Sequence, residues 1–158
     1  MQTVFIKTPL GITAIEGDES GISKITALDD SETPLSDEIP LVLQEAVIQL
    51  NDYFAGKRND FDLKLNPSGT EFQQKVWRGL LEIPFGKTLS YLEFSKKLGD
   101  PKAIRAVASA NGRNPLWIIV PCHRVIGSDG SLTGYAGGLW RKKWLLEHEF
   151  PSLQQSLF

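Results

Sequence analysis

The feature that most constrains the fold is a set of three helix starts in the second half of the chain. Thr70 and Ser90 each precede a glutamine or glutamate by three residues, a spacing typical of a capping box at a helix start. Asp100, followed by proline, is a third start. The predicted helices end at Gly99 and before Gly112, and the turn between them gives the pair the outline of a helix-turn-helix. On this pattern alone a plain helical hairpin is the preferred interpretation.

The first half of the chain contains short β-branched segments instead of capped helices. Three such segments are present: residues 3–8, 11–17 and 21–28. The glycines between them favour an antiparallel meander. A helix is expected next, with an apolar face formed by Leu43, Val47, Leu50 and Phe54. We therefore expect an α+β chain with an N-terminal unit of residues 1–68 and a C-terminal unit of residues 69–158.

The cysteine count limits how the chain can be stabilised. One cysteine and two histidines in 158 residues leave no internal disulfide and no Cys-rich zinc site, so we expect a reducing compartment and no metal. A chain of this length can bury enough surface to fold without crosslinks. The sequence has neither a signal-peptide pattern nor an apolar run that spans a membrane, so a cytoplasmic protein is expected.

The two halves of the chain differ in charge. Residues 1–85 contain 7 Lys/Arg and 14 Asp/Glu, whereas residues 86–158 contain 10 and 5. A basic C-terminal half suits a surface that binds a polyanion, although most basic faces are simply solvated. The run Arg141, Lys142 and Lys143 is interpreted as such a solvated face.

The only cysteine lies in the apolar stretch IIVPCHRVIG, which predicts a buried extended segment. A thiol is mostly protonated at neutral pH, so a nucleophilic Cys122 needs a base, and His123 is its neighbour. Because consecutive side chains of an extended segment point to opposite faces, a direct pair needs a bend at Pro121; otherwise a water must bridge the two groups. Glu149, or the histidine beside it, could orient the imidazole. A small buried hydrophobe explains a lone cysteine equally well.

The stretch NPLWIIVPCHRVIGSDGSLTGYAGGLWRKKWLLEHE, residues 114–149, closely resembles the signature region of the O6-alkylguanine-DNA alkyltransferases. The Pro-Cys-His-Arg-Val core is specific to that family, and the resemblance covers residues 70–150. It implies a ribonuclease-H-like N-terminal lobe, with a small antiparallel sheet and a helix. It also implies a mostly helical, winged-helix-like DNA-binding domain that contains a helix-turn-helix.

The resemblance implies a DNA repair protein. Such a protein transfers the alkyl group from O6 of guanine, and also from O4 of thymine, irreversibly to its own cysteine, one event per molecule. It implies a monomer that binds double-stranded DNA through the minor groove, needs no cofactor and does not associate with a membrane. The target base must be flipped out of the duplex before it can react.

The resemblance also assigns roles to single residues. Cys122 matches the acceptor, His123 the base that activates it through a water, and Glu149 the carboxylate that orients the imidazole. Asn114 matches the residue that braces the active-site loop, and Tyr91 the phenol that binds a ring nitrogen of guanine.

Further residues match the DNA-binding helix and the substrate pocket. Arg105 matches the finger that fills the gap left by the flipped base. The DNA-binding residues are Arg105, Ala106, Ser109 and Arg113. The pocket residues are Tyr91, Trp117, Val125, Tyr135, Ala136 and Gly137. Carbonyls of Cys122 and Val125 are expected to bind the exocyclic amine. Trp117 departs from the family, which carries smaller residues there, and it is expected to narrow the pocket and limit the size of the alkyl group.

Three other interpretations fit the sequence less well. A non-catalytic sensor of alkylated DNA carries tryptophan at the acceptor position, where this chain has Cys122. A helix-turn-helix regulator with an inert thiol leaves the motif around the cysteine unexplained. A Cys–His hydrolase needs an oxyanion hole that no motif here predicts.

Overall fold

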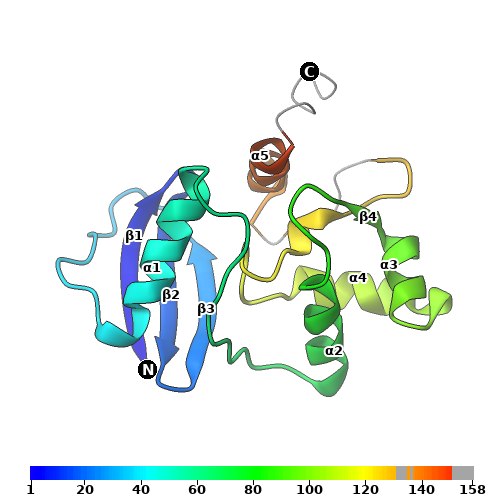
Figure 1. The fold of residues 1–158 in the computed structure, drawn as a ribbon, viewed down its shortest axis with the longest axis horizontal. Helices are drawn as coiled ribbons and strands as arrows, with labels where there is room; N and C mark the ends of the chain where they lie inside the picture. Colours follow the sequence, from blue (N-terminus) through cyan, green and yellow to red (C-terminus); the bar gives the residue numbers. More distant parts are fainter. Residues whose placement is uncertain (131–134, 136, 151–158) are drawn as a thin grey trace. The chain divides into compact units, whose positions relative to one another are not determined.

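The computed structural model describes residues 1–130, 135 and 137–150, and the chain divides into two units (Figure 1). Residues 1–68 and 115–117 form the N-terminal unit. Residues 69–114, with those from 118 onward, form the C-terminal unit. The chain therefore returns to the N-terminal unit briefly, just before the segment that contains the cysteine.

The N-terminal unit is a three-stranded sheet with one helix across it (Figure 1). Its elements are β1 (Gln2–Thr8), β2 (Gly11–Asp18), β3 (Gly21–Ala27) and α1 (Leu41–Phe54). The strands run antiparallel in the order β1-β2-β3, so the predicted meander is confirmed. The core of this unit includes the buried side chains of Val4, Ile15, Ile22, Ile25, Leu43 and Leu50.

Helix α1 packs on the sheet through its predicted apolar face, except that Tyr53 occupies the buried position predicted for Phe54. The buried residues of that face include Leu43, Val47 and Leu50. Phe54 is only half-buried, whereas Tyr53 is fully buried, with its ring 5.5 Å from that of Phe61. Positions 53 and 54 are both one helical turn after Leu50, so spacing alone does not choose between them. The contact of the Tyr53 ring with Phe61, in the segment after the helix, accounts for the burial of Tyr53.

The outer edge of β3 is covered by two segments of the same unit. Two isolated parallel bridges cover it, Ile22 with Leu65 and Ile25 with Leu116. The first requires Gly21, which has a φ of +131°, because a Cβ there would lie 2.7 Å from the Lys64 carbonyl oxygen. The second attaches residues 115–117 to the sheet. An edge covered in this way is protected from pairing with other chains.

The C-terminal unit is mostly helical (Figure 1). Its elements are α2 (Glu71–Leu80), β4 (Leu89–Ser90), α3 (Tyr91–Lys97), η1 (Pro101–Ala103), α4 (Ile104–Gly112), η2 (Cys122–Arg124), β5 (Val125–Ile126) and α5 (Leu139–Glu149). The two short strands pair in parallel, with Leu89 opposite Val125. The expected α+β class, with its helix-turn-helix formed by α3 and α4, is confirmed.

The predicted helix starts are present, with small differences at the ends. Thr70 and Ser90 each form a complete capping box. The Asp100 carboxylate accepts a hydrogen bond from the Lys102 backbone N–H at 2.9 Å, but it caps the 3₁₀ turn η1 and not α4 itself. Gly112, expected just past the third helix, is its last residue.

Helix α2 holds α4 in place. The Trp77 indole N–H donates to the Ala110 carbonyl at 2.9 Å in the buried interior. Gly69 makes room for this ring, since a Cβ there would lie 2.4 Å from it. Phe72, which the helical spacing places on the apolar face, is instead 41% exposed. It lies in the first turn of α2.

The prediction of an extended segment at the cysteine is wrong. Residues 117–119 form a turn, in which Ile118 has a φ of +73°, a strained value for a β-branched residue. Pro121 then has φ −81° and ψ 63°, and the Cys122 N–H donates to the Val120 carbonyl at 2.8 Å, as in an inverse γ-turn. The 3₁₀ turn η2 follows. The segment is buried as predicted, but it is bent and not extended.

Candidate active site

Cys122 is the first residue of η2 and is only 3% exposed. Burial raises the pKa of its thiol to about 11, and three nearby groups oppose this effect: the Asn114 side chain, the Lys142 ammonium and the Tyr135 hydroxyl. With such a pKa, about one thiol in ten thousand is ionised at pH 7. The thiol is therefore a poor nucleophile until a base removes its proton.

His123 and Arg124 both bind the carboxylate of Glu149, the last residue of α5, and all three side chains are buried. His123 Nε2 lies 2.7 Å from Glu149 Oε2. Arg124 donates from Nε to Oε1 at 2.7 Å and from Nη2 to Oε2 at 3.0 Å. Its Nη1 donates to the Ile83 carbonyl at 2.6 Å, and its guanidinium lies 5.8 Å from the centre of the Phe85 ring. The structure thus brings His123 and Glu149 together and adds Arg124, to which the sequence interpretation gave no role.

Glu149 is an anion at a helix C-terminus, where the helix dipole disfavours negative charge. Burial by itself raises the pKa of Glu149, but its contacts with His123 and Arg124 outweigh burial and lower the pKa to about 2. The carboxylate is therefore ionised at neutral pH. The contacts with Arg124 and His123 explain how an anion is tolerated at this helix end.

His123 is a neutral base in this setting. Burial lowers its pKa, Glu149 opposes that effect, and the positive charges of Arg124 and Lys142 lower the pKa further. Because an ionised carboxylate only accepts hydrogen bonds, Nε2 carries the imidazole proton and Nδ1 is the basic nitrogen. Nδ1 is buried and has no hydrogen-bond partner in the part of the chain that the structure describes. A buried acceptor of this kind is suited to receive a proton.

Asn114 and Tyr91 both lie beside the cysteine segment. Asn114 is 4% exposed, and its Nδ2 donates to the Val120 carbonyl at 2.7 Å. Tyr91 begins α3 directly after β4, and the pairing of β4 with β5 places it close to the residues that follow the cysteine. Its hydroxyl accepts a hydrogen bond of 3.4 Å from Asn111 Nδ2.

The interpretation of Arg141, Lys142 and Lys143 as a solvated face is wrong for the first two. Arg141 is 3% exposed and Lys142 is fully buried. Lys142 Nζ donates to the Val125 carbonyl at 2.8 Å and lies 5.9 Å from the centre of the Tyr91 ring. Burial lowers the pKa of Lys142 to about 8, and Cys122 opposes the effect. Most molecules therefore carry this positive charge at neutral pH.

A signal for the burial of Lys142 was present in the sequence. Residues three, four and seven positions later, Leu145, Leu146 and Glu149, fall on the same helical face. The two leucines of that face are buried and Glu149 belongs to the predicted site. Three consecutive cations are typical of a solvated surface, and that pattern favoured the opposite interpretation of Lys142.

The predicted pocket residues lie in different parts of the structure. Val125, Tyr135 and Gly137 are buried within the C-terminal unit. Ala136 lies outside the described residues. Trp117 is 8% exposed and belongs to the N-terminal unit. Its assignment to the pocket stays a prediction.

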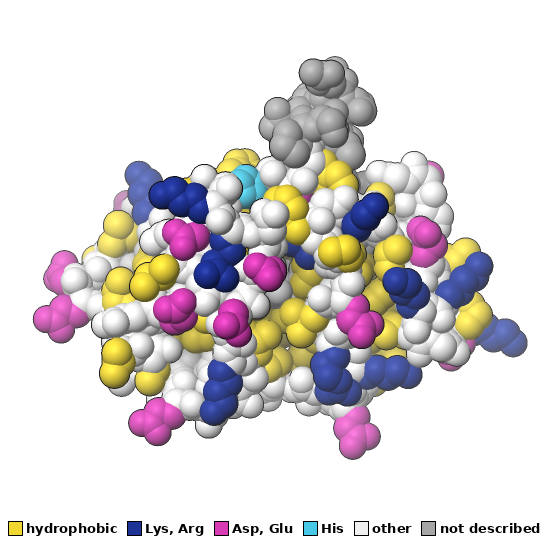
Figure 2. Space-filling model, in the orientation of Figure 1, with side chains coloured by type: hydrophobic (Ala, Val, Ile, Leu, Met, Phe, Trp, Pro, Cys, Tyr) yellow, Lys and Arg dark blue, Asp and Glu magenta, His cyan; other side chains and the backbone are white. Residues whose placement is uncertain are grey.

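Helix α4 has one exposed and one buried face. The exposed residues include three of the four predicted to bind DNA, Arg105, Ala106 and Ser109, and the fourth, Arg113, is exposed just past the end of the helix. The buried residues are Val107, Ala110 and Asn111. In the view of Figure 2, acidic side chains gather over the N-terminal unit, whereas Lys and Arg side chains are prominent over the C-terminal unit. The small residues between Arg105 and Arg113 leave room for a binding partner to approach the backbone of α4 closely.

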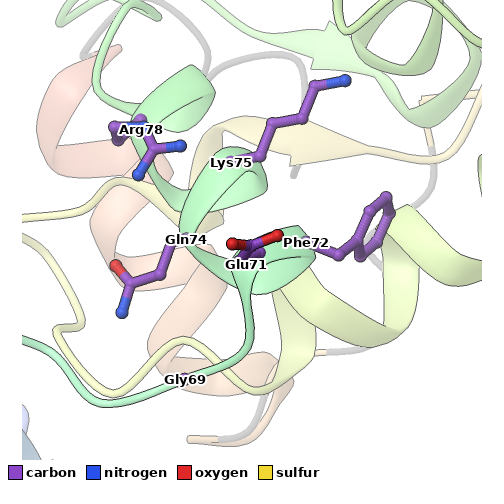
Figure 3. Close-up of a pocket in the computed structure, with 6 residues that line it drawn as sticks. All are labelled: Gly69, Glu71, Phe72, Gln74, Lys75 and Arg78. Atoms are coloured by element: carbon purple, nitrogen blue, oxygen red, sulfur yellow. The ribbon is translucent and has the colours of Figure 1, made fainter.

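A shallow depression runs along α2, and its side chains point away from one another (Figure 3). It is lined by Gly69, Glu71, Phe72, Gln74, Lys75 and Arg78. No group of three or more His, Cys, Asp or Glu side chains among the described residues could hold a metal ion. None of the described helices is long and apolar enough to cross a membrane.

Comparison with known protein families matches almost the whole chain. The family model for the ribonuclease-like domain of 6-O-methylguanine DNA methyltransferase matches residues 1–67. The model for the DNA binding domain of the same family matches residues 71–150.

Individual proteins and structures agree with this match. The methylated-DNA–protein-cysteine methyltransferase of Methanosarcina barkeri is 47% identical over 156 residues, which cover 94% of this chain and 97% of that protein. A crystal structure of Mycobacterium tuberculosis O6-methylguanine methyltransferase is similar with a TM-score of 0.83 and 46% identity, covering 94% of this chain and 92% of that one. A crystal structure of Mycobacterium tuberculosis OGT in complex with DNA has a TM-score of 0.84 and 46% identity, covering 94% and 93%. The chain therefore belongs to the 6-O-methylguanine DNA methyltransferase family.

Proposed function

We propose that this protein repairs DNA by transferring the alkyl group from O6 of an alkylated guanine, or from O4 of an alkylated thymine, to the sulfur of Cys122, once per molecule. Membership of the family supports the activity, that of a methylated-DNA–protein-cysteine methyltransferase. One observation supports its assignment to this site. A neutral, buried His123 is held by Glu149 through Nε2, while its basic Nδ1 has no partner among the described residues and belongs to the residue next to the thiol.

The first step moves a proton. His123 Nδ1 takes the proton of the Cys122 thiol through a bridging water, and Glu149 stabilises the imidazolium that forms. The Lys142 ammonium lowers the pKa of the thiol and so favours the thiolate. Lys142 offsets part of the effect of burial, and transfer of the proton to His123 supplies the thiolate that burial disfavours.

The second step moves the alkyl group. The thiolate attacks the alkyl carbon, a C–S bond forms, and the electrons of the C–O6 bond leave with the guanine. Tyr91 donates a hydrogen bond to a ring nitrogen and stabilises the negative charge that develops there. The guanine then takes up the proton that the thiol lost, so the overall reaction is balanced. The thioether has no good leaving group, and the protein is consumed.

The exposed face of α4 is suited to the duplex. Arg105 enters the stack from the minor groove and fills the gap left by the flipped base, which lowers a cost of a few kcal/mol. The minor groove carries little sequence information, so damage in any context is accessible. The protein acts as a monomer in the cytoplasm, where a reducing environment keeps the single thiol available.

Mass spectrometry tests the proposal. After mixing with an excess of duplex that carries one O6-methylguanine, every molecule is expected to gain the mass of one methyl group on the peptide that contains Cys122. Cys122→Ala should bind the same duplex without gaining mass. Repair of many lesions by each molecule, or a methyl group on another residue, would overturn the proposal.

A further inference from the structure

Asn111 is a polar side chain in the site to which neither the motif nor the mechanism above gives a role. It lies on the buried face of α4 and is 1% exposed. Its Nδ2 donates to the Cys122 backbone carbonyl at 3.4 Å and to the Tyr91 hydroxyl oxygen at 3.4 Å. One amide group therefore contacts both the residue that carries the nucleophile and the phenol that faces the leaving group.

We propose that Asn111 is a positioning residue that makes the Tyr91 hydroxyl a hydrogen-bond donor toward the alkylated base, and that holds the Cys122 carbonyl beside it. The inference rests on the proposed function, in which Tyr91 binds the leaving guanine. It adds a residue that touches neither DNA nor the reacting atoms and acts through its two partners.

The chemistry of the amide supports this role. An NH₂ group only donates, so the contact between Asn111 Nδ2 and Tyr91 has one direction, with the phenol oxygen as acceptor. The phenol proton must then point away from Asn111. A donor on the phenol oxygen also stabilises the build-up of negative charge on that oxygen, so the O–H group becomes a stronger donor.

The other end of the same amide argues against a purely structural role. Asn111 Oδ1 is buried and has no hydrogen-bond partner among the residues that the structure describes. An unsatisfied buried acceptor destabilises a fold, so an apolar side chain of similar size suits stability better at this position. A polar residue whose donors are used and whose acceptor is not serves the site and not the fold.

The position of Asn111 on α4 connects the two faces of the helix. The exposed face carries Arg105, which is proposed to enter the DNA, and the buried face carries Asn111. Helix α4 is fixed from behind by the Trp77 hydrogen bond to Ala110, the residue before Asn111. The amide is therefore presented from a rigid element, as positioning of a reactive group requires.

Two substitutions separate this role from a structural one. Asn111→Leu removes both donors without leaving a buried polar group. It should slow alkyl transfer about tenfold, roughly the value of one neutral hydrogen bond, while stability to urea is unchanged or higher. Asn111→Asp places acceptors against the phenol and turns its proton toward position 111. It should slow transfer more at neutral pH and recover toward the Asn111→Leu rate as the pH falls and the new carboxyl is protonated.

The experiment measures single-turnover transfer of the benzyl group from free O6-benzylguanine and of the methyl group from a methylated duplex, with urea unfolding of each variant. Ser95→Ala is the matched control, since Ser95 Oγ is also buried, lies on the adjacent α3 and has no partner in the described chain. Its rates should equal those of the wild type. In a Tyr91→Phe background, Asn111→Asp should lose less rate than it does beside the phenol, because only the contact with the Cys122 carbonyl is then affected.

The outcomes distinguish this inference from the proposed function. If the wild-type protein gains no alkyl group on Cys122, the proposed function fails. If the wild type reacts and Asn111→Asp reacts equally fast at every pH, or loses rate equally with and without the Tyr91 hydroxyl, the role of Asn111 is refuted. If Asn111→Leu loses stability in proportion to rate, the residue supports the fold.

Discussion

Replacing Glu149 with glutamine tests whether His123 and Arg124 depend on one shared carboxylate. Glutamine keeps the shape of the side chain but has one acceptor oxygen in place of two, and no charge. The Arg124 guanidinium, whose side chain is 7% exposed, then retains a buried positive charge without its anion. The structure therefore predicts damage to both stability and catalysis.

Two independent figures give the size of the loss of stability. Removing one partner of a buried ion pair costs about 3–5 kcal/mol. The pKa of Glu149, lowered from 4.5 to about 2, corresponds to about 3 kcal/mol of preference for the charged form in the folded state. The free energy of unfolding of Glu149→Gln at neutral pH is therefore expected to fall by about 3–5 kcal/mol.

A second substitution separates stability from catalysis. Arg124→Met in the Glu149→Gln background removes the unpaired charge, so the double variant should recover at least half of the lost stability. It should not recover activity, because His123 still lacks the carboxylate that stabilises its protonated form. We expect its transfer rate to stay about a hundredfold below that of the wild type, the lower end of what general-base catalysis contributes.

The assay combines urea unfolding at neutral pH with single-turnover transfer from a labelled methylated duplex, for the wild type, both single variants and the double variant. A double variant no more stable than Glu149→Gln would show that the Arg124 charge is not the cause of the loss. A double variant that transfers the methyl group at the wild-type rate would remove Glu149 from the mechanism.

Three more predictions follow from the geometry. Arg105→Ala should slow repair of duplex DNA by about a hundredfold or more, the order of the cost of base flipping, while the reaction with free O6-benzylguanine is unchanged; equal losses in both assays contradict the finger role. Lys142→Met should slow iodoacetamide labelling of Cys122 at pH 7, where the Lys142 ammonium is charged and favours the thiolate, and the difference from the wild type should shrink as the pH rises above about 8 and the lysine loses its charge. The stability contributed by ionised Glu149 is fully present above pH 4.5 and is lost as the pH falls toward about 2, so urea unfolding should show a steeper acid loss for the wild type than for Glu149→Gln.

Local signals predicted the helices of this chain because capping is a short-range interaction. Thr70, Ser90 and Asp100 bond to backbone groups two or three residues away, and each is found in the structure at its predicted helix or turn start. The pairing of β4 with β5 had no such signal. Strands of two residues contain no period, and their partners are distant in sequence.

The polar residues of the candidate site were predicted unevenly for a related reason. Cys122, His123 and Glu149 were assigned through the resemblance to a family, and the contact of His123 with Glu149 in the structure is consistent with those roles. Arg124 and Lys142 were missed because charged side chains are ordinarily exposed. Their burial depends on partners such as the Ile83 carbonyl that are supplied by distant segments, which no local pattern reveals.

The 3₁₀ turn at Cys122 explains why adjacent residues can do different work in this site. An extended segment sends its side chains to two opposite faces, so the first and third of any three residues share a face. A 3₁₀ turn has three residues per turn and sends three consecutive side chains in three directions. Glu149 receives two of them, His123 and Arg124, while the third, Cys122, has Asn114, Tyr135 and Lys142 near it. His123 and Arg124 thus share one carboxylate without either side chain displacing the Cys122 thiol, because the chain bends at Pro121.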